Sequence, residues 1–183
     1  MLVLRRRPCE SIVFDGGLRI KVNALQDQRA WLAISAPELR TEIVLATIAT
    51  TPDHACIAVR GPSAIAREAD GALALDVQDD DLVLLVNRAL GEAISFPGLR
   101  VSVAAIETDR AVLALELAAV SGRLTISAFP ATGGEVKIGI EAPREVRVFR
   151  EEVWRELESA NTSAGEQWSP SDLAALSNTR RRP

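Results

Sequence analysis

The side chains best suited to binding a ligand are a run of arginines near the start of the chain. Arg5, Arg6 and Arg7 follow one another, and a guanidinium group presents a planar fork of donors that matches phosphate oxygens and guanine edges. Strand-like alternation would place Arg5 and Arg7 on one face and Arg6, with Leu4, on the other. One charged row must then meet solvent or a partner. The alternative is that these arginines are edge-strand charges that discourage aggregation.

Catalytic and metal chemistry have few candidate residues. The chain has one histidine and no tyrosine, and no nucleophile stands at a recognisable spacing from a base. His54 lies near Asp53 and Cys56, but a closed zinc site needs four ligands and the sequence offers no second cluster. The run Asp79 to Asp81 lacks the alternating pattern of a calcium loop, so we interpret it as a polar linker. We therefore predict a protein that is not an enzyme and that holds no metal or cofactor.

The pattern of residues 135–159 predicts two strands and a helix, and these elements position a further arginine, Arg150. Val136, Ile138 and Ile140 alternate with polar or small residues, as in a half-buried strand. The alternation resumes after a proline and ends at Arg150. Two glutamates follow, where the dipole of a helix favours carboxylates in the first turn. We expect two strands and a short C-terminal helix, with Arg150 where the second strand meets the helix.

Both ends of the chain carry a resemblance to a known family. The opening is Met1-Leu2-Val3-Leu4, followed by the arginines and by Glu10-Ser11-Ile12. The matching positions at the other end are Gly134, Val136, Ile138, Gly139, Ile140, Ala142, Pro143, Glu145, Val146, Val148, Arg150, Glu151, Glu152 and Val153. These residues resemble the two halves of the carbon storage regulator (CsrA) family, whose opening is M-L-I-L-[TS]-R-[RK]-x-G-E-[ST]-[IL]. The halves stand at opposite ends of a chain much longer than a usual member.

The middle of the chain indicates an internal duplication. A weaker copy of the opening runs from Val83 to Ile94. The tripeptide 17–19 recurs at 98–100, an offset of 81 (98 − 17), and the proline at 62 recurs at 143 with the same offset (143 − 62). Both copies have room for one hairpin beyond the family unit. Candidate strands in these insertions are Glu42 to Ile48 and Arg123 to Phe129.

The predicted organisation is two repeats and a tail. We expect a first CsrA-like repeat at 1–78 with a degenerate C-terminal half, and a second repeat with the helix at 82–160. Residues 161–183 are expected to form a disordered tail that ends in a basic run. The predicted fold class is mainly β, with tandem CsrA-like small sheet or barrel units that form a single-chain pseudo-dimer. Whether two chains associate further is left open.

Composition is consistent with a cytoplasmic protein. Hydrophobic residues make up 48% of the chain, but no apolar run is long enough to cross a membrane or to serve as a signal peptide. Two cysteines without a signal peptide are best interpreted as reduced. The net charge of −4 argues against a generic nucleic-acid binder with a broad basic surface.

The resemblance implies an RNA site where the first strand of copy one pairs with the last strand of copy two. The family's key positions fall on Leu4, Arg5, Arg6, Arg7, Val148 and Arg150. A second, degraded site is implied at Val86, Asn87, Arg88 and Arg67, because the triple arginine is reduced to one and position 69 is alanine where position 150 is arginine.

The implied function is post-transcriptional regulation. By resemblance, the chain would recognise a GGA triplet in hairpin loops of messenger RNA and change translation or message stability. Its partners would be messenger RNA or a small regulatory RNA, with a protein antagonist as a further kind of partner and no membrane. The alternative is a protein-interaction scaffold of the same fold that has lost RNA binding.

Overall fold

The computed structural model describes residues 1–26, 29–60, 62–69, 72–77, 83–107, 110–117, 120, 122–131 and 133–166. It divides into two compact units, Met1–Val148 and Phe149–Pro183. The strands are β1 (Leu2–Arg6), β2 (Ser11–Phe14), β3 (Arg19–Gln26), β4 (Arg29–Ser35), β5 (Ile43–Thr50), β6 (His54–Arg60), β7 (Pro62–Ala69), β8 (Ala72–Val77), β9 (Val83–Ala89), β10 (Ala93–Phe96), β11 (Leu99–Ile106), β12 (Ala111–Leu117), β13 (Leu124–Ala131), β14 (Glu135–Glu141) and β15 (Val148–Arg150). A helix, α1 (Glu151–Glu166), follows β15.

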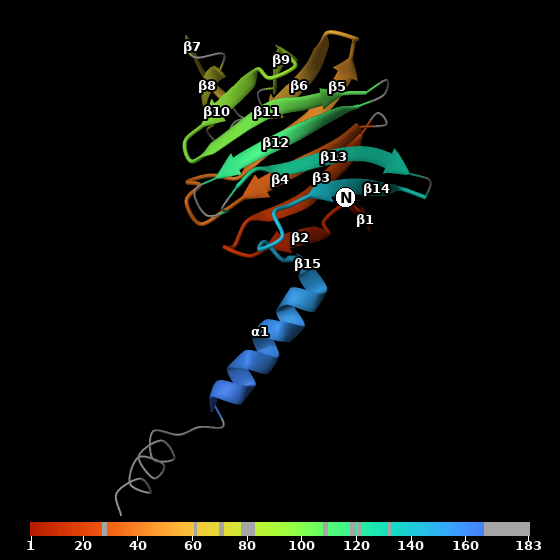
Figure 1. The fold of residues 1–183 in the computed structure, drawn as a ribbon, viewed down its shortest axis with the longest axis vertical. Helices are drawn as coiled ribbons and strands as arrows, with labels where there is room; N and C mark the ends of the chain where they lie inside the picture. The colour runs from red at the N-terminus through yellow and green to blue at the C-terminus, as the bar shows by residue number, and fades with distance from the viewer. Residues whose placement is uncertain are drawn as a thin grey trace, which may run out of the picture. The chain divides into compact units, whose positions relative to one another are not determined.

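The first unit contains two β-sheets (Figure 1). One sheet has the strand order β1-β14-β13-β12-β11-β10-β8-β7, and the other contains the order β2-β3-β4-β5-β6-β9. Buried residues of both sheets form one shared hydrophobic core, which includes Phe14 and Ile57 from one sheet and Ile94 and Ile138 from the other. The predicted mainly β fold, with tandem sheet units and a C-terminal helix, is confirmed.

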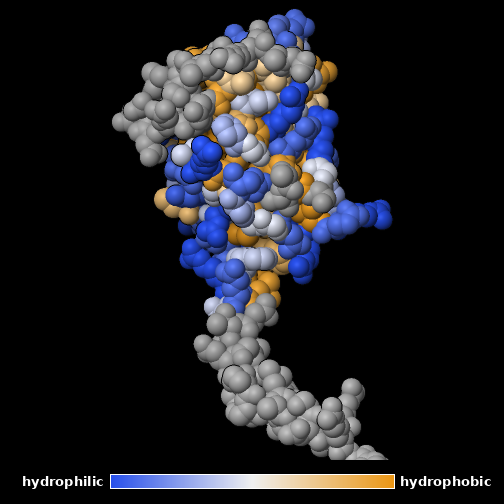
Figure 2. Space-filling view, turned by 90° about the vertical axis from the view of Figure 1, so that its left-hand side faces the viewer, coloured by the Kyte–Doolittle hydropathy of each residue, from blue (hydrophilic) through white to orange (hydrophobic). Residues whose placement is uncertain are grey.

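The alternation seen in the sequence explains why one face of each strand is buried. In β14, Val136, Ile138 and Ile140 are at most 2% exposed, while the residues between them face the other side of the sheet. On the face drawn in Figure 2, hydrophilic side chains are interspersed with small hydrophobic patches. The core therefore lies between the two sheets, and their outer faces carry the polar chemistry.

The duplication is visible in the strands. β5 and β13 begin at Ile43 and Leu124, an offset of 81 (124 − 43), and β6 and β14 begin at His54 and Glu135, again an offset of 81 (135 − 54). β5 and β13 begin one residue after the two insertion strands expected from the sequence. We call β1–β6 the first strand set and β9–β14 the second strand set.

The two strand sets exchange their first strands. β1 pairs antiparallel with β14, with Leu4 opposite Ile138, and β9 pairs antiparallel with β6, with Val86 opposite Ile57. The exchange is reciprocal, which is the pseudo-dimeric arrangement of the predicted fold. One detail differs from expectation, because the strand that pairs with β1 is β14 and not the last strand of the second repeat. The last strand, β15, begins at Val148, after the turn that follows β14.

The two strand sets end differently. After Pro62 the chain forms the β7-β8 hairpin, and β8 lies parallel to β10. After Pro143 it instead forms β15 and α1. α1 continues to Glu166 and so includes six residues, 161–166, that the sequence analysis assigned to the tail. The predicted linker at 79–81 and residues 167–183 lie outside the described residues, and the expected repeat boundaries stay a prediction.

In the part of the chain that the structure describes, no helix is both long enough and apolar enough to cross a membrane.

The turn after each exchanged strand requires a left-handed residue. Gly91 has φ of 85°, and Cys9, its counterpart at an offset of 82 (91 − 9), has φ of 73°. Both backbone N–H groups donate to equivalent carbonyls, Cys9 to Val22 at 2.7 Å and Gly91 to Val103 at 2.9 Å. The backbone of Cys9 is strained in this conformation because the residue has a Cβ atom, whereas glycine adopts it without strain.

Cys9→Gly is therefore expected to raise the free energy of unfolding by about 0.5–1 kcal/mol, since relief of the strain exceeds the added entropy of glycine in the unfolded chain. Urea denaturation measures the change. The matched control is Gly91→Cys, which should lower stability by a similar amount. A Cys9→Gly variant less stable than the parent chain would contradict the strain assignment.

Candidate nucleic-acid interface

β1 and the residue that follows it place the three consecutive arginines in two environments. Because side chains alternate along a strand, Arg5 and Arg7 lie on the outer face of the sheet, with 64% and 68% of their side chains exposed. Arg6 points the other way and is only 4% exposed. β1 is the terminal strand of its sheet, so the two exposed guanidinium groups lie at a sheet edge.

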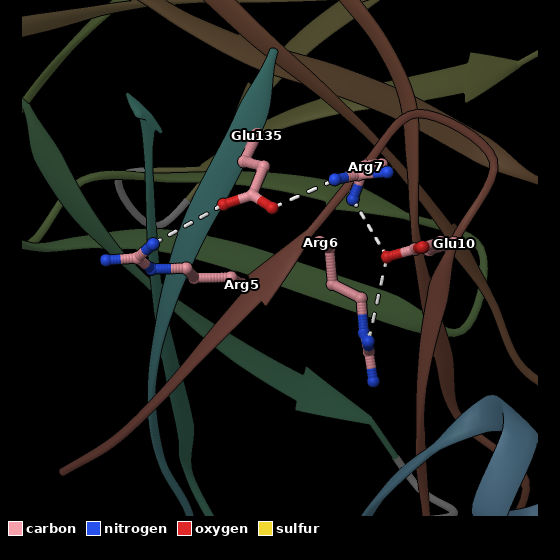
Figure 3. Close-up of polar contacts among 5 residues, drawn as sticks. All are labelled: Arg5, Arg6, Arg7, Glu10 and Glu135. Carbon is pink, nitrogen blue, oxygen red and sulfur yellow. Dashed lines mark hydrogen bonds and ion pairs between the residues drawn. The ribbon is translucent and has the colours of Figure 1, made fainter. Parts of the chain in front are cut away.

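One carboxylate lies between the two exposed guanidinium groups. Glu135, at the start of β14, is 3.6 Å from Arg5 and 3.6 Å from Arg7 (Figure 3). Ion pairs between exposed side chains contribute about 0–1 kcal/mol each, because water screens them. Glu135 therefore holds the two guanidinium groups near each other through weak, screened ion pairs.

Arg6 forms an ion pair with a glutamate at the turn after β1, and the same arrangement is found after β9. Arg6 Nη1 lies 3.7 Å from Glu10 Oε2, and the same oxygen accepts a hydrogen bond from the Arg7 N–H at 2.9 Å (Figure 3). In the second strand set, Arg88 lies 3.9 Å from Glu92, whose carboxylate accepts from the Ala89 N–H at 2.9 Å. In each set, the buried arginine and the glutamate together hold the turn that follows the exchanged strand.

The remaining predicted residues of the first site lie on two elements, β1 and β15. Leu4 and Val148 are half-buried and pack against the shared core. Arg150 is exposed at the end of β15 and belongs to the second compact unit. β1 and the residue after it thus place Leu4, Arg5 and Arg7 at one sheet edge. The participation of all six predicted residues in RNA binding stays a prediction.

The four residues predicted for a second site differ in burial and lie in two different sheets. Val86 and Arg88 are buried in β9, and Asn87 is exposed between them. Arg67 is in β7, where its backbone lies opposite Ala74, and its side chain is outside the description. β9 and β7 belong to different sheets. The exposed position that Arg5 occupies in β1 is held here by neutral Asn87, so the β9 edge lacks the corresponding positive charge.

The sequence reasoning missed a cationic and aromatic row across the outer face of the larger sheet. Arg5 pairs with Lys137 across β1 and β14, and Lys137 pairs with Phe129 across β14 and β13. Lys137 Nζ lies 5.7 Å from the centre of the Phe129 ring, and the Arg110 guanidinium lies 4.6 Å from it. The outward parity of Lys137 was readable from the sequence, but its neighbours across the sheet depend on the register.

A second contact that was not predicted from the sequence joins the segment after β14 to the turn after β2, through Arg147 and Asp15. Asp15 accepts hydrogen bonds from Arg147, at 2.9 Å from the side-chain Nε and at 3.1 Å from the backbone N–H. The hydrogen bond from the Arg147 side chain holds the pKa of the Asp15 carboxyl below its usual value. The pair therefore stabilises the fold above the ordinary pKa of aspartate, and this contribution is lost as the pH falls through the lowered pKa.

Neither metal nor disulfide chemistry gives a competing site in the described residues. No group of three or more potential metal ligands comes together in the described segments. Cys9 and Cys56 are both free thiols. The described residues at this surface carry guanidinium, ammonium and aromatic groups.

Comparison with known families matches both ends of this chain. The sequence model of CsrA, described as the global regulator protein family, matches residues 1–48 and 119–159. These ranges contain β1 with its arginines and β14, β15 and the first part of α1. The elements that form the candidate interface are thus the ones that the family shares.

Individual relatives give the same result. The chain is 47% identical over 45 residues to the translational regulator CsrA of Treponema pallidum, a match that covers 24% of this chain and 62% of that protein. It is 49% identical over 43 residues to the translational regulator CsrA of Thermotoga petrophila, covering 24% and 52%. The corresponding protein of Geotalea uraniireducens is 31% identical over 58 residues, covering 32% and 72%. The chain thus spans between about half and three fifths of the length of the first two relatives. No solved structure matches it.

Proposed function

Since this chain belongs to the CsrA family of global regulators, we propose that it is an RNA-binding regulator that acts after transcription. Its target is a GGA triplet in the loop of a messenger RNA hairpin, and binding changes translation or message stability. The protein acts in the cytoplasm and is not an enzyme. Small regulatory RNA and a protein antagonist are the further partners that this role implies.

The observation that carries the proposal is the pair of exposed guanidinium groups of Arg5 and Arg7 at the edge of a sheet. Sequence-specific recognition of RNA commonly targets unpaired bases in loops, which offer their edges to a protein. A terminal strand has unpaired backbone N–H and C=O groups that can form hydrogen bonds with the edges of such bases. The planar guanidinium groups of arginines can bind neighbouring phosphates or guanine edges. Charge confined to one edge also fits a chain with a net charge of −4.

A hairpin that displays GGA in its loop tests this function against the same hairpin with a scrambled loop. We expect binding at least tenfold tighter to the GGA loop, because lost base contacts cost about 1–3 kcal/mol each. Arg150→Ala, measured in parallel, is expected to weaken GGA binding through loss of the guanidinium at the end of β15. Arg40→Ala removes an exposed arginine from another loop and serves as the matched control. Equal binding to both hairpins would sink the proposal.

The second candidate function, a protein-interaction scaffold, has one observation in its favour. Near the exposed edge of β9, Val83, Leu85 and Leu90 are 43%, 60% and 64% exposed. Edge strands with exposed apolar side chains favour pairing with another chain. This candidate would be preferred if neither hairpin bound and Arg150→Ala changed nothing.

A further inference from the structure

The outer faces of the two sheets differ at one structurally equivalent place. Trp31 in β4 pairs with Ala24, next to an irregularity in the register of β3 and β4. Val112 in β12 pairs with Ala105, next to the same irregularity in β11 and β12. The offset is 81 for both partners (112 − 31 and 105 − 24). Val112 therefore occupies in the second strand set the place that Trp31 occupies in the first.

In the first strand set this place is filled. The indole of Trp31 is only 7% exposed and packs on Ala46 and Ala58. The guanidinium of Arg60 stacks over the ring, 4.7 Å from its centre. A flat bicyclic ring thus lies on the sheet, with apolar atoms below it and a planar cation above.

In the second strand set the same place is open. Val112 has much less volume than tryptophan, and Gly139 stands where the first set has Ala58 (139 − 58 = 81). A groove of about 370 Å³ results, lined by Val112, Gly139, Phe129, Val3 of β1 and Met1, which precedes β1. A Cβ added at Gly139 would lie 2.7 Å from Ser127 Oγ, so the glycine keeps the floor of the groove open. Its volume is within the range of sites for small ligands.

Polar groups surround this apolar floor. Glu141 lines the groove and occupies the position equivalent to Arg60 (141 − 60 = 81). Arg110 lines it as well and forms an ion pair with Glu107. The Phe129 ring, with the charges of Arg110 and Lys137 close to it, forms one wall. The groove therefore offers two planar groups for stacking, the Phe129 ring and the guanidinium that lies over it, and the Glu141 carboxylate as a hydrogen-bond acceptor.

We propose that this groove binds the ring of one unpaired purine of the RNA that β1 holds, an inference that rests on the proposed function. A purine is a flat bicyclic ring of nearly the size of an indole, and the first strand set demonstrates that an indole fits the equivalent place. The Glu141 carboxylate can accept hydrogen bonds from the N–H groups of a purine edge, as carboxylates do with base amino groups. Guanine offers two adjacent N–H donors to the two carboxylate oxygens.

The groove and the arginine edge share one strand, which is why a single RNA can reach both. Val3 lines the groove, and Arg5, two residues further along the same face of β1, flanks Glu135. Successive residues on one face of a strand are about 6.6 Å apart, which is close to the spacing of neighbouring nucleotides in an extended chain. An unpaired base next to a GGA triplet held at Arg5 and Arg7 would therefore come close to the groove.

The test uses the GGA hairpin in three forms: bare, with the loop extended by one unpaired purine beside the GGA triplet, and with the loop extended by a uridine at the same place. For the parent chain we expect the purine extension to bind about tenfold tighter than the uridine extension, the effect of stacking one base on an aromatic ring. Val112→Trp fills the groove with the residue that the other sheet carries. It should reduce this ratio to about one while the bare hairpin binds as before.

Phe129→Leu is the second variant, because it removes the aromatic wall and keeps an apolar side chain. It should also lower the ratio several-fold. Urea denaturation of both variants checks that they fold. A ratio near one in the parent chain, or a full ratio retained in folded Val112→Trp, overturns the purine site and leaves the proposed function standing. Failure of the parent chain to bind the bare hairpin overturns both.

Discussion

Replacing Arg5 and Arg7 together by alanine is expected to weaken binding of a GGA hairpin by about a hundredfold. Both guanidinium groups are exposed on the outer face at the sheet edge, and each forms a screened ion pair with Glu135 of β14. A hydrogen bond to a charged group contributes about 1.5–3 kcal/mol when it is formed, and two such losses correspond to at least a hundredfold change in affinity. The dependence on salt should also fall, by about 1.4, since each neutralised phosphate of a single strand contributes about 0.7 to the slope.

Titration of labelled hairpin at several salt concentrations measures both quantities. Lysine at the same two positions keeps the charge but loses the planar fork, so it should restore most of the salt slope and only part of the affinity. Arg40→Ala serves again as the control for loss of one exposed arginine outside β1. Unchanged affinity in the double alanine variant would assign Arg5 and Arg7 to protection of the sheet edge, the alternative that the charge run itself allows.

Phe14→Ala is expected to lower the free energy of unfolding by about 3–5 kcal/mol, a large fraction of the stability of a typical domain. Phe14 is 0% exposed and lies in the core shared by both sheets. Its counterpart Phe96, at an offset of 82 (96 − 14), is 6% exposed in the same core. Because the strand sets exchange β1 and β9, a cavity in one set should destabilise both. We expect one cooperative transition at a lower urea concentration.

Far-ultraviolet circular dichroism and tryptophan fluorescence, recorded on the same urea series, test this expectation. Coincident curves indicate a single transition. Phe149→Ala is the matched control, because this phenylalanine belongs to the second compact unit, where its ring lies 5.3 Å from that of Trp154. It should leave the main transition nearly unchanged. Two separated transitions, with only one shifted by Phe14→Ala, would mean that each strand set folds alone.

Much of the fold was predictable because its signals are local. Alternation at Val136, Ile138 and Ile140 predicted a strand, and these side chains are the buried face of β14. Glutamates after Arg150 predicted the start of α1, which begins at Glu151. The offset of 81 predicted a duplication that reappears in the bounds of β5 and β13. Each of these features depends on residues near one another in the chain or on a repeat that a comparison of the chain with itself detects.

The candidate site was only partly predictable. Alternation separated Arg5 and Arg7 from Arg6, and the structure places the first two outside and the third inside. Sequence reasoning nevertheless treated Arg6 like its neighbours, because a run of three arginines does not reveal which face of the strand is covered. Glu10, four residues after Arg6, was the local signal that an ion pair would hold it.

The sequence by itself determined the strand pattern, the family and the charged character of the first strand, because backbone geometry and family motifs are written in contiguous residues. Tertiary structure decided that β1 pairs with β14, that Glu135 lies between Arg5 and Arg7, and that Val112 leaves open the place that Trp31 fills. The first two outcomes depend on the register of β1 and β14, which lie more than a hundred residues apart in the chain, and the third depends on the residues that β12, β13 and β14 bring together. A shift of one residue in the register of β1 and β14 would move every side chain of β1 to the opposite face of the sheet. The sequence pattern alone does not determine which strand pairs with β1.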